Sequence, residues 1–138
     1  MVRELYIGLM SGTSMDAIDA ALVDFSHDDI QLVSTSSISL PETMRHTLLA
    51  LGSSGADEIE QMGRIDRSLA QLFAEAALAT LSGTRYTAKD VRAIGSHGQT
   101  IRHRPTGEHP FTLQIADPNT IAECTSITVI ADFRRRDI

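Results

Sequence analysis

Three strand-like segments follow one another at the start of the chain. Residues 4–10 form a short apolar run, and residues 30–40 are rich in β-branched and hydroxyl side chains. Residues 18–25 fit either a helical face or an alternating strand, but their short length and the polar turn at 26–29 favour a strand. Segments this close in sequence pair by folding back on one another, so they predict an antiparallel meander.

Two helices are predicted after this meander. Pro41 opens the first over residues 41–51, because proline in a first helical turn loses no hydrogen bond. Residues 57–81 have apolar side chains at helical spacing, and Ser54 followed three positions later by Asp57 fits a capping box. The apolar stripe comprises Ile59, Met62, Ile65, Leu69, Leu72, Phe73 and Ala76. We expect this stripe to pack against the rest of the domain.

Strands and helices alternate in the remaining sequence. Residues 91–97 and 111–116 are predicted strands, with a loop containing glycine and proline over 98–110. Asp117 and Pro118 supply an N-cap and a first-turn proline for a short helix, and the final twelve residues begin with a strand at 127–133. A meander followed by this alternation predicts an α/β fold with a mixed sheet.

The composition fits one soluble domain over residues 1–138. Apolar residues make up 42% of the chain, and the net charge of −6 is spread without a basic face, which argues against a nucleic-acid partner. No stretch approaches the roughly 20 apolar residues of a membrane span. The N-terminus also lacks the small-residue cleavage site of a signal peptide. We therefore expect no membrane association and a cytoplasmic location.

Two features near the C-terminus lead to further expectations. Residues 127–138 read as a buried strand and a polar turn, and because such a strand normally has something packed after it, we expect a longer protein. The single cysteine, Cys124, cannot form an internal disulfide, so we expect a small buried apolar side chain.

A small, hydroxyl-rich loop separates the first two predicted strands. Gly12 is flanked by Ser11, Thr13 and Ser14, and backbone amides next to glycine and hydroxyl groups suit an anion such as phosphate. A Walker loop is excluded, because the only lysine is Lys89. A dinucleotide fingerprint is excluded as well, because the third glycine is missing.

Two other interpretations of this loop stay open. It can be an ordinary polar turn without a ligand, or half of a serine-hydrolase elbow with Ser14 as nucleophile, although Asp16 stands where that elbow needs glycine. Farther along, His97 and Gln99 directly follow a predicted strand and suit hydrogen bonds to hydroxyl and acetamide groups, or they simply stabilise a turn. The spacing of His97, His103 and His109 fits no common zinc site.

Four motifs in order resemble the N-terminal portion of the anhydro-N-acetylmuramic acid kinases. They are IGLMSGTSMDAIDAALVDF, AIGSHGQTIRHRP, FTLQIADPNTIAE and VIADFRRRDI, spread from Tyr6 to Ile138. Residues 32–89 match only in general pattern. The family belongs to the sugar-kinase, Hsp70 and actin superfamily. The resemblance thus implies a ribonuclease H-like, actin-like ATPase lobe with a five-stranded mixed sheet and flanking helices. It also implies a second lobe that is absent from this chain, with ATP bound between the lobes.

The resemblance also implies site residues. The ATP phosphates would lie on residues 12–19, and the amino sugar near His97 and Gln99, while Arg134 would pair with the lactyl carboxylate and Asp132 would orient it. Arg135 and Arg136 are expected on a solvated face. The phosphate residues are Gly12, Thr13, Ser14, Met15, Asp16, Ala17, Ile18 and Asp19.

This chain departs from the family pattern at three positions. Ala17 and Ala116 replace glycines, and at position 17 alanine would cost roughly 1 kcal/mol if the backbone required a positive φ. Met10 stands where the superfamily has an aspartate, so the ligands of Mg²⁺ are undetermined, with Asp16 or Asp19 as candidates.

The implied reaction is ATP-dependent phosphorylation with hydrolytic ring opening of 1,6-anhydro-N-acetylmuramic acid to N-acetylmuramic acid 6-phosphate. It serves peptidoglycan recycling and uses ATP and Mg²⁺. The family's catalytic base comes from a motif that this chain lacks, so we expect the chain alone to be inactive. For the full-length protein the resemblance implies a homodimer. The alternative is a non-catalytic, truncated actin-like module or pseudokinase.

Overall fold

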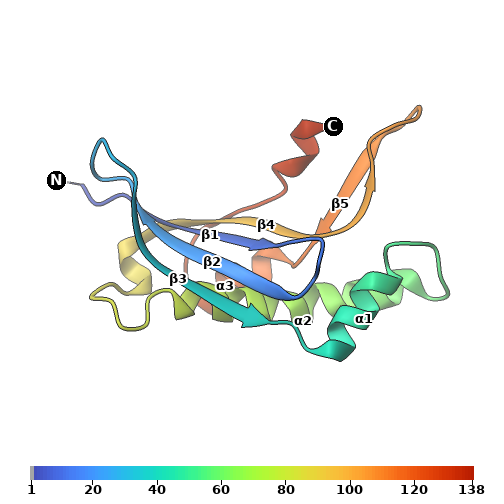
Figure 1. Cartoon of the computed structure of the whole chain (residues 1–138), viewed down its shortest axis with the longest axis horizontal. Coiled ribbons are helices and arrows are strands. Elements are labelled where there is room, and N and C mark those ends of the chain that lie inside the picture. The colour runs from blue at the N-terminus through green and yellow to red at the C-terminus, as the bar shows by residue number, and fades with distance from the viewer. Residues whose placement is uncertain (1) are drawn as a thin grey trace.

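The computed structural model describes residues 2–138 and has six strands and three α-helices (Figure 1). The strands are β1 (Leu5–Ser11), β2 (Ala17–Asp24), β3 (Gln31–Ser39), β4 (Val91–Arg104), β5 (Phe111–Ile115) and β6 (Val129–Ile130). The helices are α1 (Glu42–Ala50), α2 (Glu58–Ala79) and α3 (Pro118–Thr125), with short 3₁₀ turns η1 (Ala88–Asp90) and η2 (Arg134–Asp137).

One mixed sheet organises the domain. Its order is β3-β2-β1-β4-β5, with β6 also paired to β4. The pairs β1–β2, β2–β3 and β4–β5 are antiparallel, whereas β1–β4 and β6–β4 are parallel. The predicted meander and the α/β class with a mixed sheet are confirmed, and the arrangement is consistent with part of an actin-like ATPase lobe.

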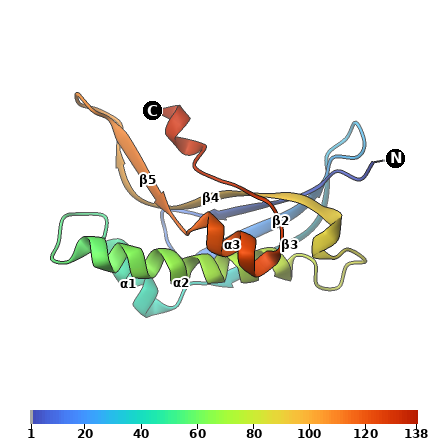
Figure 2. The ribbon, with the colours of Figure 1, turned by 180° about the vertical axis from the view of Figure 1, so that it is seen from behind.

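The three α-helices lie on one face of the sheet, and η2 lies on the other (Figures 1 and 2). The stripe of α2 that faces the sheet contains four alanines, which let the helix approach closely. Ser34 and Ser36 of β3 donate hydrogen bonds to the carbonyls of Thr80 and Ala76 at the end of α2. The largest fully buried side chains of this layer include Phe73, Leu69, Ile7, Leu22 and Ile94.

The start of α2 differs from the prediction. Asp57 has a left-handed backbone conformation with φ 52°, and its side chain caps nothing in the helix, so the predicted capping box with Ser54 is wrong. Glu58 instead fixes the segment that precedes the helix. Its carboxylate accepts the amide hydrogen of Gly55 and pairs with Arg102 of β4, and the hydrogen bond from Arg102 is the main cause that lowers the pKa of the Glu58 carboxyl.

The central strand β4 is twice as long as predicted. It continues through residues 98–104, where a loop was expected, because β5 supplies hydrogen-bond partners along this half in the register His103↔Thr112. The last strand is correspondingly short. β6 pairs only with Ile94 and Gly95, since β5 occupies the same edge of β4 from Gln99 onward.

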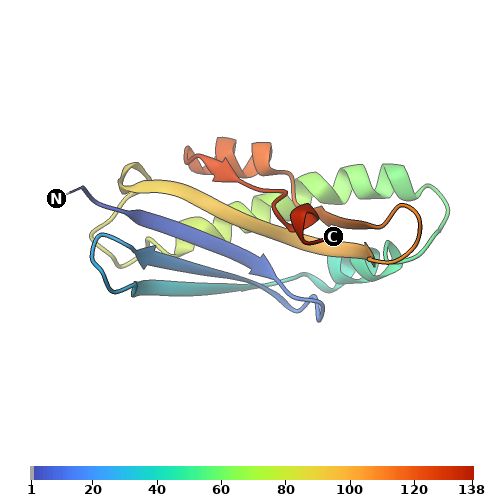
Figure 3. The same ribbon diagram turned by 90° about the horizontal axis from the view of Figure 1, so that it is seen from above.

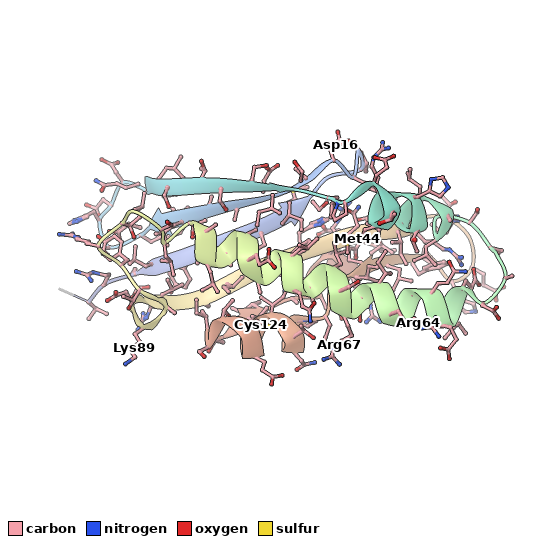
Figure 4. All side chains as sticks on the ribbon, turned by 90° about the horizontal axis from the view of Figure 1, so that it is seen from below. Asp16, Met44, Arg64, Arg67, Lys89 and Cys124 are labelled. Carbon is pink, nitrogen blue, oxygen red and sulfur yellow. The ribbon has the colours of Figure 1, made fainter. Side chains whose placement is uncertain are left out.

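Two smaller findings concern the surface. Cys124 is exposed on α3, so the expectation of a buried cysteine is wrong (Figure 4). Residue 124 falls on the outward side of a helix whose buried positions are Thr120, Ile121 and Thr125. Within residues 2–138, none of the helices has both the length and the apolar character needed to cross a membrane.

Candidate functional site

The parallel strands β1, β4 and β6 bring three predicted site segments to one edge of the sheet. The loop 12–16 follows β1, residues 97–99 lie on β4 opposite the end of β1, and residues 131–134 follow β6. In open α/β sheets, ligands bind outside the carboxyl ends of the parallel strands, and this edge is that location here. Segments about 120 positions apart in sequence therefore lie at the same edge of the sheet.

The β1–β2 loop exposes its hydroxyl groups and buries its methionine. Gly12, Thr13 and Ser14 are exposed, whereas Met15 is 7% exposed and packs in the core. The Met15 amide donates to the Gly12 carbonyl at 3.1 Å and closes the turn, with Met15 at φ 54°. Neither the Thr13 nor the Ser14 hydroxyl has a hydrogen-bond partner among residues 2–138, so both are free to donate to a ligand.

The second half of the loop is fixed to its surroundings. The Arg45 guanidinium of α1 donates to the Ser14 carbonyl at 3.3 Å and lies 3.6 Å from the Asp16 carboxylate. The Asp16 carbonyl accepts the Leu40 amide at 2.9 Å. Ala17 begins β2 opposite Ser39 and is not among the residues with positive φ, so alanine is accommodated there without backbone strain.

A hollow on the open face of the sheet adjoins this edge. Its volume is about 550 Å³, and small residues in the middle of three strands form its floor. Asp19, His97 and Phe133 line its sides. Figure 3 shows η2 above the sheet on this face. Asp19 is exposed here, opposite Met10 in the β1–β2 register. The floor residues are Gly8, Ala21 and Gly95.

A bulge in β4 sends its neighbouring side chains in different directions. Leu9 pairs with Ser96 and Ser11 with Gln99, so β4 has one extra residue over this interval. Gly98 lies in the bulge with φ 73°, and a Cβ there would stand 2.6 Å from the Ile115 carbonyl oxygen. Only glycine fits this position. His97 on one side lines the open-face hollow, and Gln99 on the other side is fully buried.

His97 and Arg134 are in direct contact. A guanidinium nitrogen of Arg134 lies 3.0 Å from His97 Nε2, and His97 Nδ1 lies 3.0 Å from the Gly98 carbonyl oxygen. Because a guanidinium only donates, Nε2 accepts, and the network assigns the ring proton to Nδ1, which donates to Gly98. Arg134 also pairs with Asp137 at 3.4 Å. The arginine is therefore held from both sides.

Asp132 does not contact Arg134. Its carboxylate accepts a hydrogen bond from Arg135 at 3.0 Å, and both side chains are well exposed, as expected for Arg135. Asp132 has a left-handed backbone with φ 59°, which turns the chain sharply out of the sheet after β6. Its place in the site is the rim of a small cavity of about 90 Å³ between β4, β5 and α3.

This small cavity contains two features that the sequence did not reveal. Ser96 lines it, and the Ser96 hydroxyl is a buried side-chain polar atom with no hydrogen-bond partner within the described residues 2–138. Ala116 also lines it and has φ 98°, a conformation suited to glycine. The Ala116 amide donates to the Asp66 carboxylate of α2 at 2.9 Å, while partial burial raises the pKa of Asp66. Side chains alternate along β4, so Ser96 points to the same side as the buried Ile94. This alternation could have predicted a buried serine from the sequence.

Gln99 lies beneath the loop, where its polar atoms all have partners. Its Oε1 accepts the Ser11 hydroxyl, and its Nε2 donates to the carbonyls of Gly12 at 3.3 Å and Thr100 at 3.1 Å. Ser11 is also buried. A polar residue at an inward position of an otherwise apolar strand needs such a partner, and that alternation in β1 was a signal that sequence reasoning missed.

The chemistry of the edge suits anions. Lys89, the only lysine, lies at the opposite end of the sheet from Asp16 (Figure 4), so a cation from lysine plays no part here. Arg45 and Arg134 are the guanidinium groups beside the loop and the bulge. No group of three or more His, Cys, Asp or Glu side chains within residues 2–138 is placed to hold a metal without help from a ligand.

Comparisons with known proteins place the chain in a family. A family model described as anhydro-N-acetylmuramic acid kinase matches residues 4–138. The chain belongs to the anhydro-N-acetylmuramic acid kinase family. Proteins of that name from Shewanella loihica and Coxiella burnetii are 56% and 51% identical over 138 residues. Another from Shewanella sp. strain ANA-3 is 53% identical. In each case the match covers 100% of this chain and 37% of the relative.

Proposed function

We propose that this chain forms the N-terminal lobe of an ATP-dependent sugar kinase that acts on 1,6-anhydro-N-acetylmuramic acid. The observation that carries the proposal is that the exposed Gly12–Thr13–Ser14 loop and the His97–Arg134 pair lie near the carboxyl ends of β1 and β6, beside the middle of β4. Family membership supports it, because the matching relatives are named for that substrate. The chain spans 37% of their length, so the remainder of the active site would come from elsewhere in a full-length kinase.

The loop would bind the phosphates of ATP without a lysine. Exposed hydroxyls at Thr13 and Ser14 and the amides around Gly12 provide hydrogen-bond donors for phosphate oxygens. In phosphoryl transfer most of the protein's contribution is positioning and charge stabilisation, and Mg²⁺ neutralises phosphate charge. Asp19 suits the water shell of that ion, since it is exposed beside the loop, whereas Asp16 is already paired with Arg45.

The sugar would lie between the bulge and η2. Arg134 is suited to the carboxylate of the substrate, because a guanidinium binds carboxylates through two parallel hydrogen bonds. We assign His97 to holding Arg134, since the His97 ring nitrogens already contact Arg134 and Gly98. Asp132, at the rim of the small cavity, is exposed enough to accept a hydrogen bond from a sugar hydroxyl. Ring opening needs a base for the attacking water, which we place in the part of the relatives beyond this chain.

Nucleotide binding by the 138-residue chain tests the phosphate assignment. Isothermal titration with ATP and Mg²⁺ should give weak, saturable binding, and Thr13→Ala with Ser14→Ala should weaken it about tenfold, the effect of losing hydrogen bonds to a charged group. The matched control is Ser53→Ala with Ser54→Ala, because this pair of adjacent serines is also exposed in a loop but lies away from the site. Equal affinity in the two double variants would contradict the assignment.

Sugar binding tests the other half of the proposal. A thermal-shift titration with the anhydro sugar should raise the melting temperature of the chain, and Arg134→Gln should remove most of that shift because it removes the cation. Arg104→Gln on the β4–β5 hairpin is the control, since Arg104 is exposed and distant from the bulge. If a partner protein stabilised the chain but the sugar and ATP did not, a non-catalytic actin-like module would be the better interpretation.

A further inference from the structure

We propose that Gln99 is a positioning residue that orients the phosphate loop, in place of the direct sugar contact that the resemblance implies. This inference rests on the proposed function of the loop. Gln99 is fully buried, and a bound sugar at the surface would not reach its amide. The strand that carries Gln99 is β4, whereas the loop belongs to the β1–β2 connection, 87 positions earlier in the chain.

The Gly12 carbonyl is the point where Gln99 acts. This oxygen accepts two hydrogen bonds, one from the Met15 amide at 3.1 Å and one from Gln99 Nε2 at 3.3 Å. The peptide that follows Gly12 is planar and trans, because the structure has no cis peptide bond within the described residues. In a trans peptide the carbonyl and the amide hydrogen point in opposite directions. Holding the Gly12 oxygen inward therefore directs the Thr13 amide outward, toward the position of an anion.

Gln99 itself has little freedom to move. Its amide group has a partner for each polar position, namely the Ser11 hydroxyl at Oε1 and the carbonyls of Gly12 and Thr100 at Nε2. Buried polar groups that lose a partner cost free energy, so the network favours one rotamer. The orientation of the loop is thereby fixed from the strand next to it, before any ligand arrives.

The bulge at Gly98 explains why Gln99 is available for this task. The β1–β4 register pairs Leu9 with Ser96 and Ser11 with Gln99, so the extra residue brings Gln99 level with the start of the loop. The same bulge leaves His97 on the open face, where it contacts Arg134. One irregularity in β4 thus sets the position of both proposed half-sites, with Gln99 serving the phosphates and His97 serving the arginine.

The decisive variant is Gln99→Glu, studied at alkaline pH so that the buried carboxyl is ionised; it keeps the shape of the side chain and its acceptor oxygen but replaces the donor to Gly12 with a second acceptor. We expect the backbone amide resonance of Thr13 to shift in ¹⁵N NMR spectra and ATP to bind about tenfold more weakly, as for the loss of a charge-assisted hydrogen bond. Binding of the anhydro sugar should change by less than about twofold, because sites that do not share contacts usually influence one another no more than this. Gln61→Glu is the matched control, since Gln61 also donates to a backbone carbonyl but lies on α2.

A second variant covers the case in which Gln99→Glu does not fold. Ser11→Ala removes only the hydroxyl that donates to Gln99 Oε1 and should shift the same Thr13 resonance by a smaller amount. The proposal is overturned if the Thr13 resonance and ATP affinity stay unchanged while sugar binding is lost, because Gln99 would then contact the sugar. If the wild-type chain binds no ATP, the proposed function fails, whereas the Thr13 resonance still decides whether Gln99 positions the loop.

Discussion

The two faces of the central sheet follow opposite rules. The face toward α2 and α3 buries large apolar side chains such as Ile7, Leu22 and Ile94, and its buried polar side chains have partners except for the Ser96 hydroxyl. The open face has Gly8, Ala21 and Gly95 at its centre, and a hollow forms above them. Both faces come from the same strands, so the residues that stabilise the fold and those that shape the open surface alternate along each strand.

The largest predicted loss of stability comes from a substitution on the face that the helices cover. Phe73 of α2 is fully buried, so Phe73→Ala should destabilise the domain by about 3–5 kcal/mol through lost burial and a cavity. Chemical denaturation followed by circular dichroism measures this. Leu32→Ala on β3 is the control, because Leu32 is 64% exposed and should change stability by less than about 0.5 kcal/mol. Similar losses for the two variants would mean that the faces do not differ as described.

Two glycines of β4 sharpen the comparison. Gly98→Ala should cost about 3 kcal/mol, because its φ is positive and the new Cβ would meet the Ile115 carbonyl. Gly95→Ala should be neutral or should stabilise by up to about 1 kcal/mol, since a Cβ at this position on the open face meets nothing within 4 Å. Melting temperatures of both variants test the pair. A large loss at Gly95 would show that the open face is packed more tightly than the structure indicates.

Low pH should reduce the stability of the domain by protonating Asp117, the N-cap of helix α3 on the covered face. Hydrogen bonds from the Thr120 hydroxyl, followed by those from Asn119, lower the pKa of Asp117 below its ordinary value of 3.8. The native state therefore releases this proton more readily than the unfolded chain does. Its stabilising contribution is present above pH 3.8 and is lost as the pH falls through the lower native pKa.

Asp117→Asn tests this pH dependence. Asparagine keeps a cap acceptor, so stability at pH 7 should fall by no more than about 1 kcal/mol. Below pH 4, the free energy of unfolding should fall less steeply with decreasing pH, because the variant has one carboxylate fewer that takes up a proton on unfolding. Thr120→Val, which removes the strongest donor to Asp117, should give an intermediate slope. An unchanged slope in the asparagine variant would contradict the assignment.

The smallest predicted effects concern the two alanines at positions where the resemblance implies glycine. Ala116 has φ 98°, so Ala116→Gly should stabilise the domain by about 1 kcal/mol through relief of backbone strain. Ala17 begins β2 without a positive φ, so Ala17→Gly should destabilise it by about 0.5–1 kcal/mol through added freedom in the unfolded chain. Differential scanning calorimetry distinguishes the opposite signs, and equal signs would refute the backbone explanation.

Much of the fold followed from local sequence patterns. The meander, the long helix and the Asp117 cap depend on residues close together in the chain, and alternation or helical spacing reveals them. The extension of β4 through residues 98–104 depends on pairing with β5, which outweighs the glycine and the polar composition of that stretch. The short β6 has the same origin, because two strands share one edge of β4.

The site was less predictable than the fold. The exposed turn between β1 and β2 could be located because glycine and hydroxyl side chains cluster in sequence. The orientation of Gln99 could not, since the bulge at Gly98 reverses the direction expected from simple alternation. The contact of Arg134 with His97 likewise depends on the left-handed turn at Asp132, a conformation that aspartate adopts more readily than most residues but that no local pattern specifies here.

Met15 has a consequence for ligand affinity. Its side chain is inserted in the core while its neighbours stay in water, so the turn loses most of its conformational freedom when the domain folds. Under the proposed function, a phosphate bound at Thr13 and Ser14 would meet a turn that is already ordered, so less conformational entropy would be lost on binding. The buried thioether of Met15 would then contribute to affinity by ordering the turn.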